Sequence, residues 1–494
     1  MSPGSVNRAG RRLAGLAFLG VVASSGCVVG PHYSRPSAAV PPAYKERGGS
    51  ATPSASQNLP LQWWQLFGDP QLDTLEEQIR VSNQNLKESE AQYRQARALV
   101  RFYRADLYPT ATAGASAAPQ HASDNKPPVS SLSGSTYTDL QLTGDLSYEI
   151  DAWGRVRHAV ESARENAEAS AADLATVSLS LQSELAADYF ELRSADAQKK
   201  LLDSTVDDYE KALQLTENRY HGGLSSNVDV EQARTQLETT RAQDIDVGVQ
   251  RAQFEDAIAV LVGKPASTFT LSFSPAGEPP PPIPVGIPSQ VLERRPDIAS
   301  AERRVAAANA GIGIARAAYF PSITLSAAGG FESGSLGTLL QGPALFWNLG
   351  ATAAETVFDA GRRRAVTEQA QAAYDQTTAA YRQTVLTAFQ EVEDNLAALR
   401  ILEQEARTED VAVQAAQRSL ALSENRYRGG VANYLEVLTA QSAALADERA
   451  AVDILRRRLD SSVLLVKALG GGWDAATGIP QAESMANGIA NSGH

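Results

Sequence analysis

The stretch Glu217-Asn218-Arg219-Tyr220-His221-Gly222-Gly223-Leu224 returns later in the chain as Glu424-Asn425-Arg426-Tyr427-Arg428-Gly429-Gly430-Val431. Each copy ends a long helical pattern and precedes a shorter one. Glycine readily adopts the left-handed backbone conformation that closes many helices, so each copy predicts a helix end and a sharp reversal. Two copies this far apart do not form a solenoid period and predict duplication of half the chain.

Two further landmarks recur in the same order. The stretch from Tyr148 to Arg155 resembles 356–362, and Gly154 and Gly361 are separated by as many positions as Glu217 and Glu424. Tyr108-Pro109 returns as Phe320-Pro321 at a slightly larger separation. Chance similarity of Ala-rich helices does not preserve such an order, so we interpret the chain as a duplicated architecture.

The composition excludes some classes of protein. The 494 residues carry a formal net charge of −13 and a sequence pI near 5.1, whereas nucleic-acid binding needs a basic surface. Aromatic residues make up 6% of the chain, and Ala and Gln are abundant. This composition favours long packed helices over a thick globular core.

The N-terminus predicts export and a lipid anchor. Three arginines precede the short apolar run 13–23, so 1–26 reads as a signal peptide. The run ends at Ser24-Ser25-Gly26-Cys27, and Cys27 is the only cysteine. This segment resembles a bacterial lipobox, although Ser24 stands where Leu is usual. The resemblance implies cleavage before Cys27, acylation of its thiol, and sorting to the outer membrane because neither following residue is Asp.

Composition shifts predict six segments. The first is the signal peptide, and a Pro-, Ser- and Gly-rich stretch then predicts an extended tether. Four consecutive prolines from Pro279 predict a rigid linker between the two repeats. After the signal peptide, the predicted segments are the tether at 27–60, the first repeat at 61–274, the linker at 275–288, the second repeat at 289–472 and a disordered tail at 473–494.

Two uninterrupted helical patterns dominate the repeats. Neither 155–220 nor 362–427 contains Pro or an internal Gly, and at 1.5 Å per residue each spans roughly 100 Å. Helices of this length predict a projecting coiled-coil-like assembly. Shorter helical patterns cover 70–107, 228–262, 289–319 and 433–469.

Four stretches show the alternation of strands, at about 109–119, 138–151, 321–332 and 344–358. In the second of them, Leu142, Leu146 and Ile150 interleave with polar residues. Such a strand is either half-buried in a soluble protein or lipid-facing in a barrel with a wet lumen. No window outside the signal resembles a transmembrane helix, so a spanning part must consist of strands.

Four strands cannot close a transmembrane barrel alone, since such barrels begin near eight strands. Two copies supply eight strands and three supply twelve. An eight-stranded barrel is filled by its own side chains. A conduit continuing into long helices therefore favours three copies.

Signatures of chemistry are missing from the sequence. There is no phosphate-binding loop, no nucleophile elbow and no His/Cys metal spacing. Most acidic residues lie among Gln and Arg on helical patterns, which is typical of solvated faces. We expect no enzyme activity, no catalytic residues, no cofactor and no bound metal.

Several motifs together resemble the TolC-like outer-membrane efflux proteins, most closely their lipid-anchored NodT/OprM-type branch. These motifs are the paired Arg-Tyr-x-Gly-Gly turns, Trp63-Trp64-Gln65-Leu66-Phe67-Gly68-Asp69-Pro70, Leu292-Glu293-Arg294-Arg295-Pro296-Asp297-Ile298 and Ala318-Tyr319-Phe320-Pro321-Ser322. The resemblance covers about 29–472. It implies a mainly helical homotrimer in which a 12-stranded β-barrel in the outer membrane continues into a periplasmic helical barrel.

The resemblance also implies a function. Such a protein is the passive exit duct of a tripartite pump of the resistance-nodulation-division (RND) type. A periplasmic adaptor reaches it, and the inner-membrane partner supplies the energy. No nucleic-acid partner is expected.

Site residues follow from the repeated turns. Beyond their role as helix caps, we expect the turns to present Gly222, Gly223, Leu224 and Ser225, with Gly429, Gly430 and Val431, to the adaptor. Asp229 and Glu436 each lie six residues beyond a second glycine; they are either exposed first-turn acids or a ring constricting the pore. The position of Glu436 resembles that of an acidic constriction residue of the family, although Thr439 replaces a second acid. Closure then requires Arg219, Arg426 or Arg428 to pair with carboxylates or tip carbonyls.

Two alternatives remain at this stage. A periplasmic coiled-coil adaptor would share the helical hairpins and the lipid anchor, but four symmetrically placed alternating strands argue against it. A duct of a protein-secretion system would share every feature. The sequence does not identify the cargo.

Overall fold

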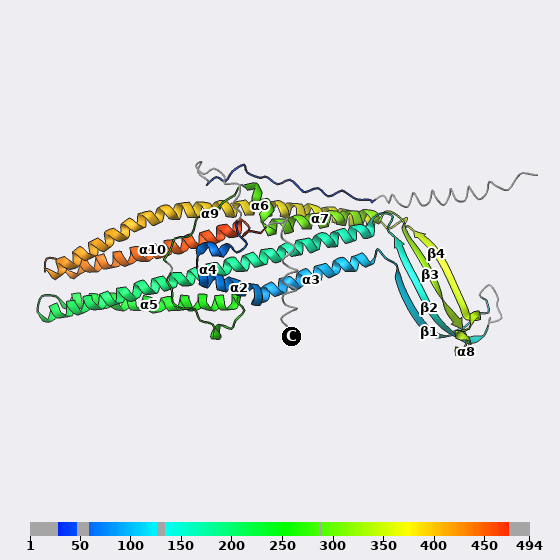
Figure 1. The fold of residues 1–494 in the computed structure, drawn as a ribbon, viewed down its shortest axis with the longest axis horizontal. Helices are drawn as coiled ribbons and strands as arrows, with labels where there is room; N and C mark the ends of the chain where they lie inside the picture. Colours follow the sequence, from blue (N-terminus) through cyan, green and yellow to red (C-terminus); the bar gives the residue numbers. More distant parts are fainter. Residues whose placement is uncertain (1–27, 47–58, 126–133, 276, 287, 474–494) are drawn as a thin grey trace, which may run out of the picture. The chain divides into compact units, whose positions relative to one another are not determined.

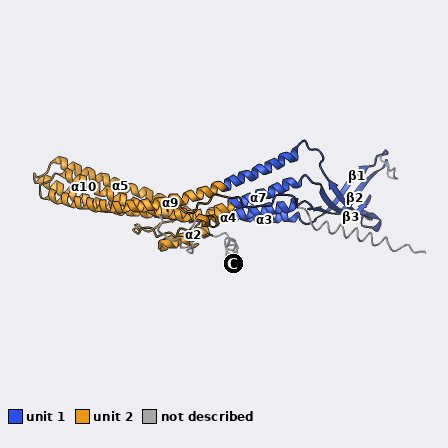
Figure 2. Ribbon diagram, turned by 90° about the horizontal axis from the view of Figure 1, so that it is seen from above, with its two compact units in different colours: residues 1–36, 93–170, 301–381 blue, residues 37–92, 171–300, 382–494 orange. Residues whose placement is uncertain are grey.

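The computed structural model describes residues 28–46, 59–125, 134–275, 277–286 and 288–473 (Figure 1). Cys27, the predicted signal peptide and nearly all of the predicted tail lie outside these ranges. The chain divides into two compact units (Figure 2). Unit 1 contains the four strands and the helical segments next to them, and unit 2 contains the remaining helices.

One antiparallel sheet of unit 1 holds β1 (Thr110–His121), β2 (Thr136–Ile150), β3 (Ser322–Ser333) and β4 (Leu345–Ala354). The strands lie in sequence order, so β1 and β4 form the two edges. Four strands were predicted at these places. The fourth ends at Ala354, earlier than the predicted 358.

The register gives the sheet one apolar face. Leu146 lies opposite Ala111 on one side and Ala327 on the other, and Ala327 lies opposite Leu349. Alternate residues of a strand share a face, so the large apolar side chains gather together. They remain exposed in a single chain, and Trp347 has 74% of its surface accessible.

Two long helices start beside the sheet. They are α4 (Arg155–His221) and α9 (Arg362–Arg428). Asp151 accepts hydrogen bonds from the backbone N–H groups of Val156 and Arg157 at 3.1 and 2.9 Å. Asp359 accepts hydrogen bonds from the backbone N–H of Gly361, just before α9, at 3.0 Å and from that of Arg363, in its first turn, at 3.1 Å. A carboxylate at this place satisfies donors that have no partner within the helix.

The shorter helices differ from the prediction at two breaks. The predicted helix 70–107 is divided into α2 (Pro70–Ser82) and α3 (Gln84–Ala105). Asn83 lies between them with extended backbone, accepts a bond from Leu86 N and donates one to Leu261 O. The buried amide of Asn83 thus bonds both the start of α3 and the distant Leu261, and these two bonds stabilise the contact between the two segments.

The predicted helix 289–319 is divided into α6 (Pro288–Arg294) and α7 (Pro296–Ala317). The residue before a proline is disfavoured in helical conformation, which explains the break at Arg295. The other two helices agree with the prediction within a residue or two, at α5 (Asn227–Leu261) and α10 (Tyr434–Ala468). Short turns complete the fold: η1 (Trp63–Phe67), η2 (Ala266–Thr268), α8 (Leu336–Leu339) and η3 (Gly342–Ala344).

The core of unit 2 includes the two tryptophans of η1. Trp63 and Trp64 of η1 are fully buried. The Tyr189 hydroxyl of α4 donates a 2.5 Å hydrogen bond to Asp69, whose other carboxylate oxygen caps α2. The quoted Trp-Trp motif therefore anchors the short helices on α4.

The segment 28–46 contains no helix or strand and is attached to the folded body, more tightly than the predicted tether. In unit 1, Val29 N donates to Trp153 O at 3.1 Å, and Asn309 donates to Pro31 O at the same distance. In unit 2, Lys45 N donates to Glu393 at 2.7 Å, and Tyr44 is buried. The hydrogen bonds fix the route of the residues that follow Cys27.

Candidate functional site

The first tip, residues 222–225, joins α4 to α5 in unit 2. Gly223 has a φ of 72°, and Leu224 N donates to Arg219 O at 2.8 Å, which closes α4 as predicted. The backbone of Gly222 does not have a positive φ, so this residue continues the last turn of α4. The Leu224 side chain is 72% exposed.

The second tip, residues 429–431, joins α9 to α10 with the same geometry. Gly430 has a φ of 74°, and Val431 N donates to Arg426 O at 3.0 Å. The Val431 side chain is 71% exposed. Each tip therefore presents one glycine in the left-handed region and one exposed aliphatic side chain.

Asp229 is engaged in capping α5. Its carboxylate accepts hydrogen bonds from Ser226 N at 3.0 Å and Ser225 Oγ at 2.6 Å, and the Ser226 hydroxyl accepts one from Asp229 N. Burial alone would raise the pKa of Asp229, but the bonds from both serines outweigh it and lower the pKa. Asp229 is therefore a fixed anion at neutral pH.

Glu436 occupies the same position in α10 but keeps its carboxylate available. Asn433 caps this helix by accepting a bond from Glu436 N at 3.1 Å. The Glu436 carboxylate instead faces Arg426, with 3.3 Å between Oε1 and Nη1. Both side chains are substantially exposed, so this ion pair contributes at most about 1 kcal/mol.

The three predicted arginines have different partners. Arg219 donates to the backbone carbonyl of Arg428 at 3.2 Å, and its guanidinium lies 4.6 Å from the ring centre of Tyr427. Arg428 itself pairs with Glu424 one turn earlier. Arg219 thus links the end of α4 to the second tip, while Arg426 and Arg428 pair within their own hairpin.

Tyr427 is the tip residue that the sequence reasoning missed. Its side chain is only 5% exposed, and its hydroxyl lies 3.4 Å from Ser225 Oγ. Tyr220, its counterpart in the first copy, is exposed. The repeated motif contains both tyrosines but does not indicate which is buried, because the burial of Tyr427 depends on contacts distant in sequence.

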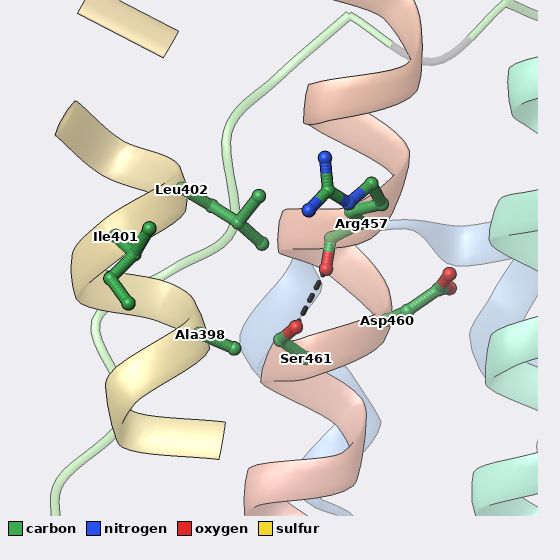
Figure 3. A pocket seen from close by; sticks show the side chains of 6 residues that line it. All are labelled: Ala398, Ile401, Leu402, Arg457, Asp460 and Ser461. Atoms are coloured by element: carbon green, nitrogen blue, oxygen red, sulfur yellow. Dashed lines mark hydrogen bonds between the residues drawn. The ribbon is translucent and has the colours of Figure 1, made fainter. Parts of the chain in front are cut away.

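Figure 3 shows a shallow hollow lined by α9 and α10, in which Leu402 faces Arg457 and Ser461 bonds the Arg457 carbonyl. Asp460 lines it and turns toward α4. Nearby, the Arg456 guanidinium contacts Glu191 of α4 at 2.5 Å and Asp460 at 3.1 Å. One Asp460 oxygen is buried without a hydrogen-bond partner in the described part of the chain.

Two acids in this region have raised pKa values. Burial raises the pKa of Asp460 to about 7, with the Glu191 carboxylate as the second cause. Burial raises the pKa of Asp188, one turn before Glu191, to about 6, and Glu184 and Glu191 add to the effect. Arg456 is shared by Glu191, Asp453 and Asp460, so the negative charge of the other two acids adds to burial in raising the pKa of Asp460.

We expect stability to fall as the pH rises from about 4 to about 7. A carboxyl group with a raised pKa binds its proton more tightly in the folded chain than in the unfolded chain. Its contribution to the stability of the fold is therefore complete at a pH below its ordinary pKa. The contribution is lost as the pH rises through the raised pKa. Discounted for partial exposure, the effect of Asp460 is about 2 kcal/mol. Urea unfolding in detergent at pH 5 and pH 8 measures it. Asp460→Asn should remove most of the difference, and an unchanged difference would contradict this assignment.

Among the described residues, no cluster of His, Cys, Asp and Glu side chains has an arrangement that could hold a metal ion. No helix in the ranges given above is both long and apolar enough to cross a membrane.

Comparison with known proteins places this geometry in a family. The model of the outer membrane efflux protein family matches residues 75–264 and 287–471. The chain belongs to this family. The two matched segments correspond to the two copies of the duplication.

Individual outer-membrane proteins resemble it along most of their length. The toluene efflux pump outer membrane protein TtgF of Pseudomonas putida is 34% identical over 466 residues, covering 93% of this chain and 97% of TtgF. The probable outer membrane lipoprotein SilC of Salmonella typhimurium is 30% identical over 451 residues, covering 91% and 96%. The solved outer-membrane channel OprN matches with a TM-score of 0.84 and 31% identity, over 90% of this chain and 100% of OprN.

The predicted TolC-like fold and the predicted role as an outer-membrane exit duct for efflux are confirmed by this membership. TtgF is named as the outer membrane protein of an efflux pump and OprN as an outer-membrane channel, which favours the duct over the coiled-coil adaptor.

Proposed function

We propose that three copies of this outer membrane efflux protein close one duct, which passively conducts small molecules from the periplasm to the exterior. The observation that carries the proposal is the four-stranded sheet with two open edges and one apolar face. An exposed edge invites pairing with another chain, and closure into a barrel removes all edges. Three copies supply twelve strands, enough to enclose a passage.

The two tips support a periplasmic adaptor as the partner of the duct. The exposed Leu224 and Val431, each beside a glycine that permits close backbone approach, suit helical hairpins of a periplasmic adaptor. The adaptor connects the duct to an inner-membrane pump of the RND type, which supplies the energy. The similarity to TtgF, named as part of a toluene efflux pump, supports a small-molecule cargo.

The native mass of the detergent-purified protein tests this proposal. We expect a particle of three chains that copurifies with its adaptor and pump. A particle of one or two chains, or copurification with a protein-secretion apparatus alone, would contradict it.

We further propose that a lipid on Cys27 anchors the chain to the outer membrane. Cys27 is the only cysteine, and the residues that follow are fastened to the body at Val29 and Pro31. The similarity to SilC, named as a probable outer membrane lipoprotein, supports the anchor.

Cys27→Ser is expected to abolish incorporation of radioactive fatty acid, because no other thiol is present to be acylated. The barrel part should still insert, since its strands do not depend on the lipid. Labelling of the immunoprecipitated protein measures the effect, with a serine-to-alanine change at Ser25 as the control. Labelling that persists in Cys27→Ser would refute the anchor.

A further inference from the structure

The two edge strands, β1 and β4, have no strand partner on their outer sides within the described chain. Under the proposed trimer, on which this inference rests, β4 of one copy meets β1 of the next. The pairing register at this seam decides which residues face each other. The duplication provides a way to derive it.

The two hairpins begin with equivalent pairs. Thr110 lies opposite Ser147 at the start of the β1–β2 hairpin, and Ser322 lies opposite Ala354 at the start of the β3–β4 hairpin. Thr110 is therefore equivalent to Ser322. Ser147 and Ala354 have the same separation in sequence as Gly154 and Gly361, a landmark of the duplication that does not depend on the strand pairing.

The contact between the hairpins within one chain can then be transferred to the seam. In that contact Leu146 lies opposite Ala327. Leu146 precedes Ser147 by one position, so its equivalent is Ala353. Ala327 follows Ser322 by five positions, so its equivalent is Ala115. We propose that Ala353 of one copy lies opposite Ala115 of the next, which sets the register of the entire seam.

The faces of the two strands agree with this register. Ala353 lies opposite Ile323 and shares the apolar face of β4 with Leu349, while Ala115 lies opposite Leu142 on the apolar face of β1. A slip of one residue would place apolar side chains on the polar face. A slip of two residues would leave the apolar side chains on the apolar face, so the faces alone do not exclude it. The equivalence of the two hairpins does exclude it, because it assigns one partner to each residue.

The early end of β4 supplies a second, independent observation. The last residues of β2, from Tyr148 to Ile150, extend past β1 and pair only with β3. Their equivalents are 355–357, which have no strand partner in the described chain, and Val357 is 92% exposed. In the proposed register Val357 lies opposite Ala111 of the next copy, because Ile150 lies opposite Ile323. Pairing would thus extend β4 to the length that its sequence pattern predicts.

Engineered disulfides measure the register in the full-length protein. We choose Ala353→Cys with Ala115→Cys, and Thr352→Cys with Ser116→Cys. Neighbouring pairs of an antiparallel ladder alternate between a closer and a wider type, so one of these two pairs has the closer spacing. The parent chain, whose one cysteine is Cys27, gives the background. Oxidation should yield covalent dimers and trimers in the membrane.

The matched controls are Ala353→Cys combined with Ala113→Cys or with Ala117→Cys. Diagonal neighbours are about 7–8 Å apart, too far for a disulfide, so cross-linking should be several-fold weaker. Single variants expressed together should give covalent dimers and no covalent trimers, since each seam needs one cysteine of each kind.

Native mass separates the possible failures. Trimers that cross-link best through Ala113 or Ala117 would overturn the register and leave the proposed function intact. Trimers that cross-link through none of these pairs would also overturn the register. A particle without three chains would overturn the seam together with the proposed duct.

Discussion

Replacing Gly223 or Gly430 by Trp is expected to abolish drug efflux while trimers still reach the outer membrane. A Cβ at Gly223 would meet no atom within 4 Å, and the nearest atom at Gly430 is 3.9 Å away. A large side chain therefore fits the chain itself, apart from about 1–2 kcal/mol of strain at positive φ. It would instead block the approach of the adaptor. Each 1.4 kcal/mol of lost docking energy weakens adaptor binding about tenfold.

Asn is the matched control at both glycines, since it tolerates the left-handed backbone and adds little bulk. Gly223→Asn and Gly430→Asn should retain most of the drug resistance and most of the adaptor binding. Resistance and protein levels are measured in the same strain. Normal resistance of both Trp variants at normal protein levels would remove the docking proposal.

Opposite changes of ion selectivity are expected from the two members of the Glu436–Arg426 pair. We propose that threefold symmetry arranges these pairs around the pore axis at its narrowest part. Glu436→Gln leaves Arg426 uncompensated and should lower the preference for cations. Arg426→Gln leaves the carboxylate uncompensated and should raise that preference. Block by multivalent cations should change in the same two directions.

Asp229→Asn serves to separate capping from gating. The Asp229 carboxylate is already held by Ser225 and Ser226, so its loss should mainly destabilise α5, by about 1 kcal/mol. Reversal potentials in a salt gradient give the selectivity of all three variants. If Glu436→Gln and Arg426→Gln shift selectivity in the same direction, the pair does not line the constriction.

The sequence predicted the elements that local chemistry determines. Long runs without Pro or Gly predicted α4 and α9, and the paired glycines predicted both tips. The break at Arg295 had a local signal in the following Pro296. The break at Asn83 had none, because that residue leaves the helical conformation to bond the carbonyl of Leu261, far away in the sequence.

The candidate site shows the same division. The caps formed by Ser226 and Asn433 were not predicted, although each has a short-range signal in a Ser or Asn three residues before the acid. The contact of Arg219 with Tyr427 and the cluster of Glu191 with Asp460 join residues of different hairpins. Neither periodicity nor spacing indicates such contacts, because they depend on how the two halves pack. For the same reason the sequence did not show that only one of two equivalent tyrosines is buried.

Planar-bilayer recording of the purified wild-type protein, without adaptor or pump, tests the central claim that three copies form one passive duct. We expect discrete, cation-selective steps from trimeric fractions, with selectivity lowered by Glu436→Gln. Conductance steps that require an added energy source would contradict this claim. So would trimeric fractions of wild type and of Glu436→Gln that both form no channel.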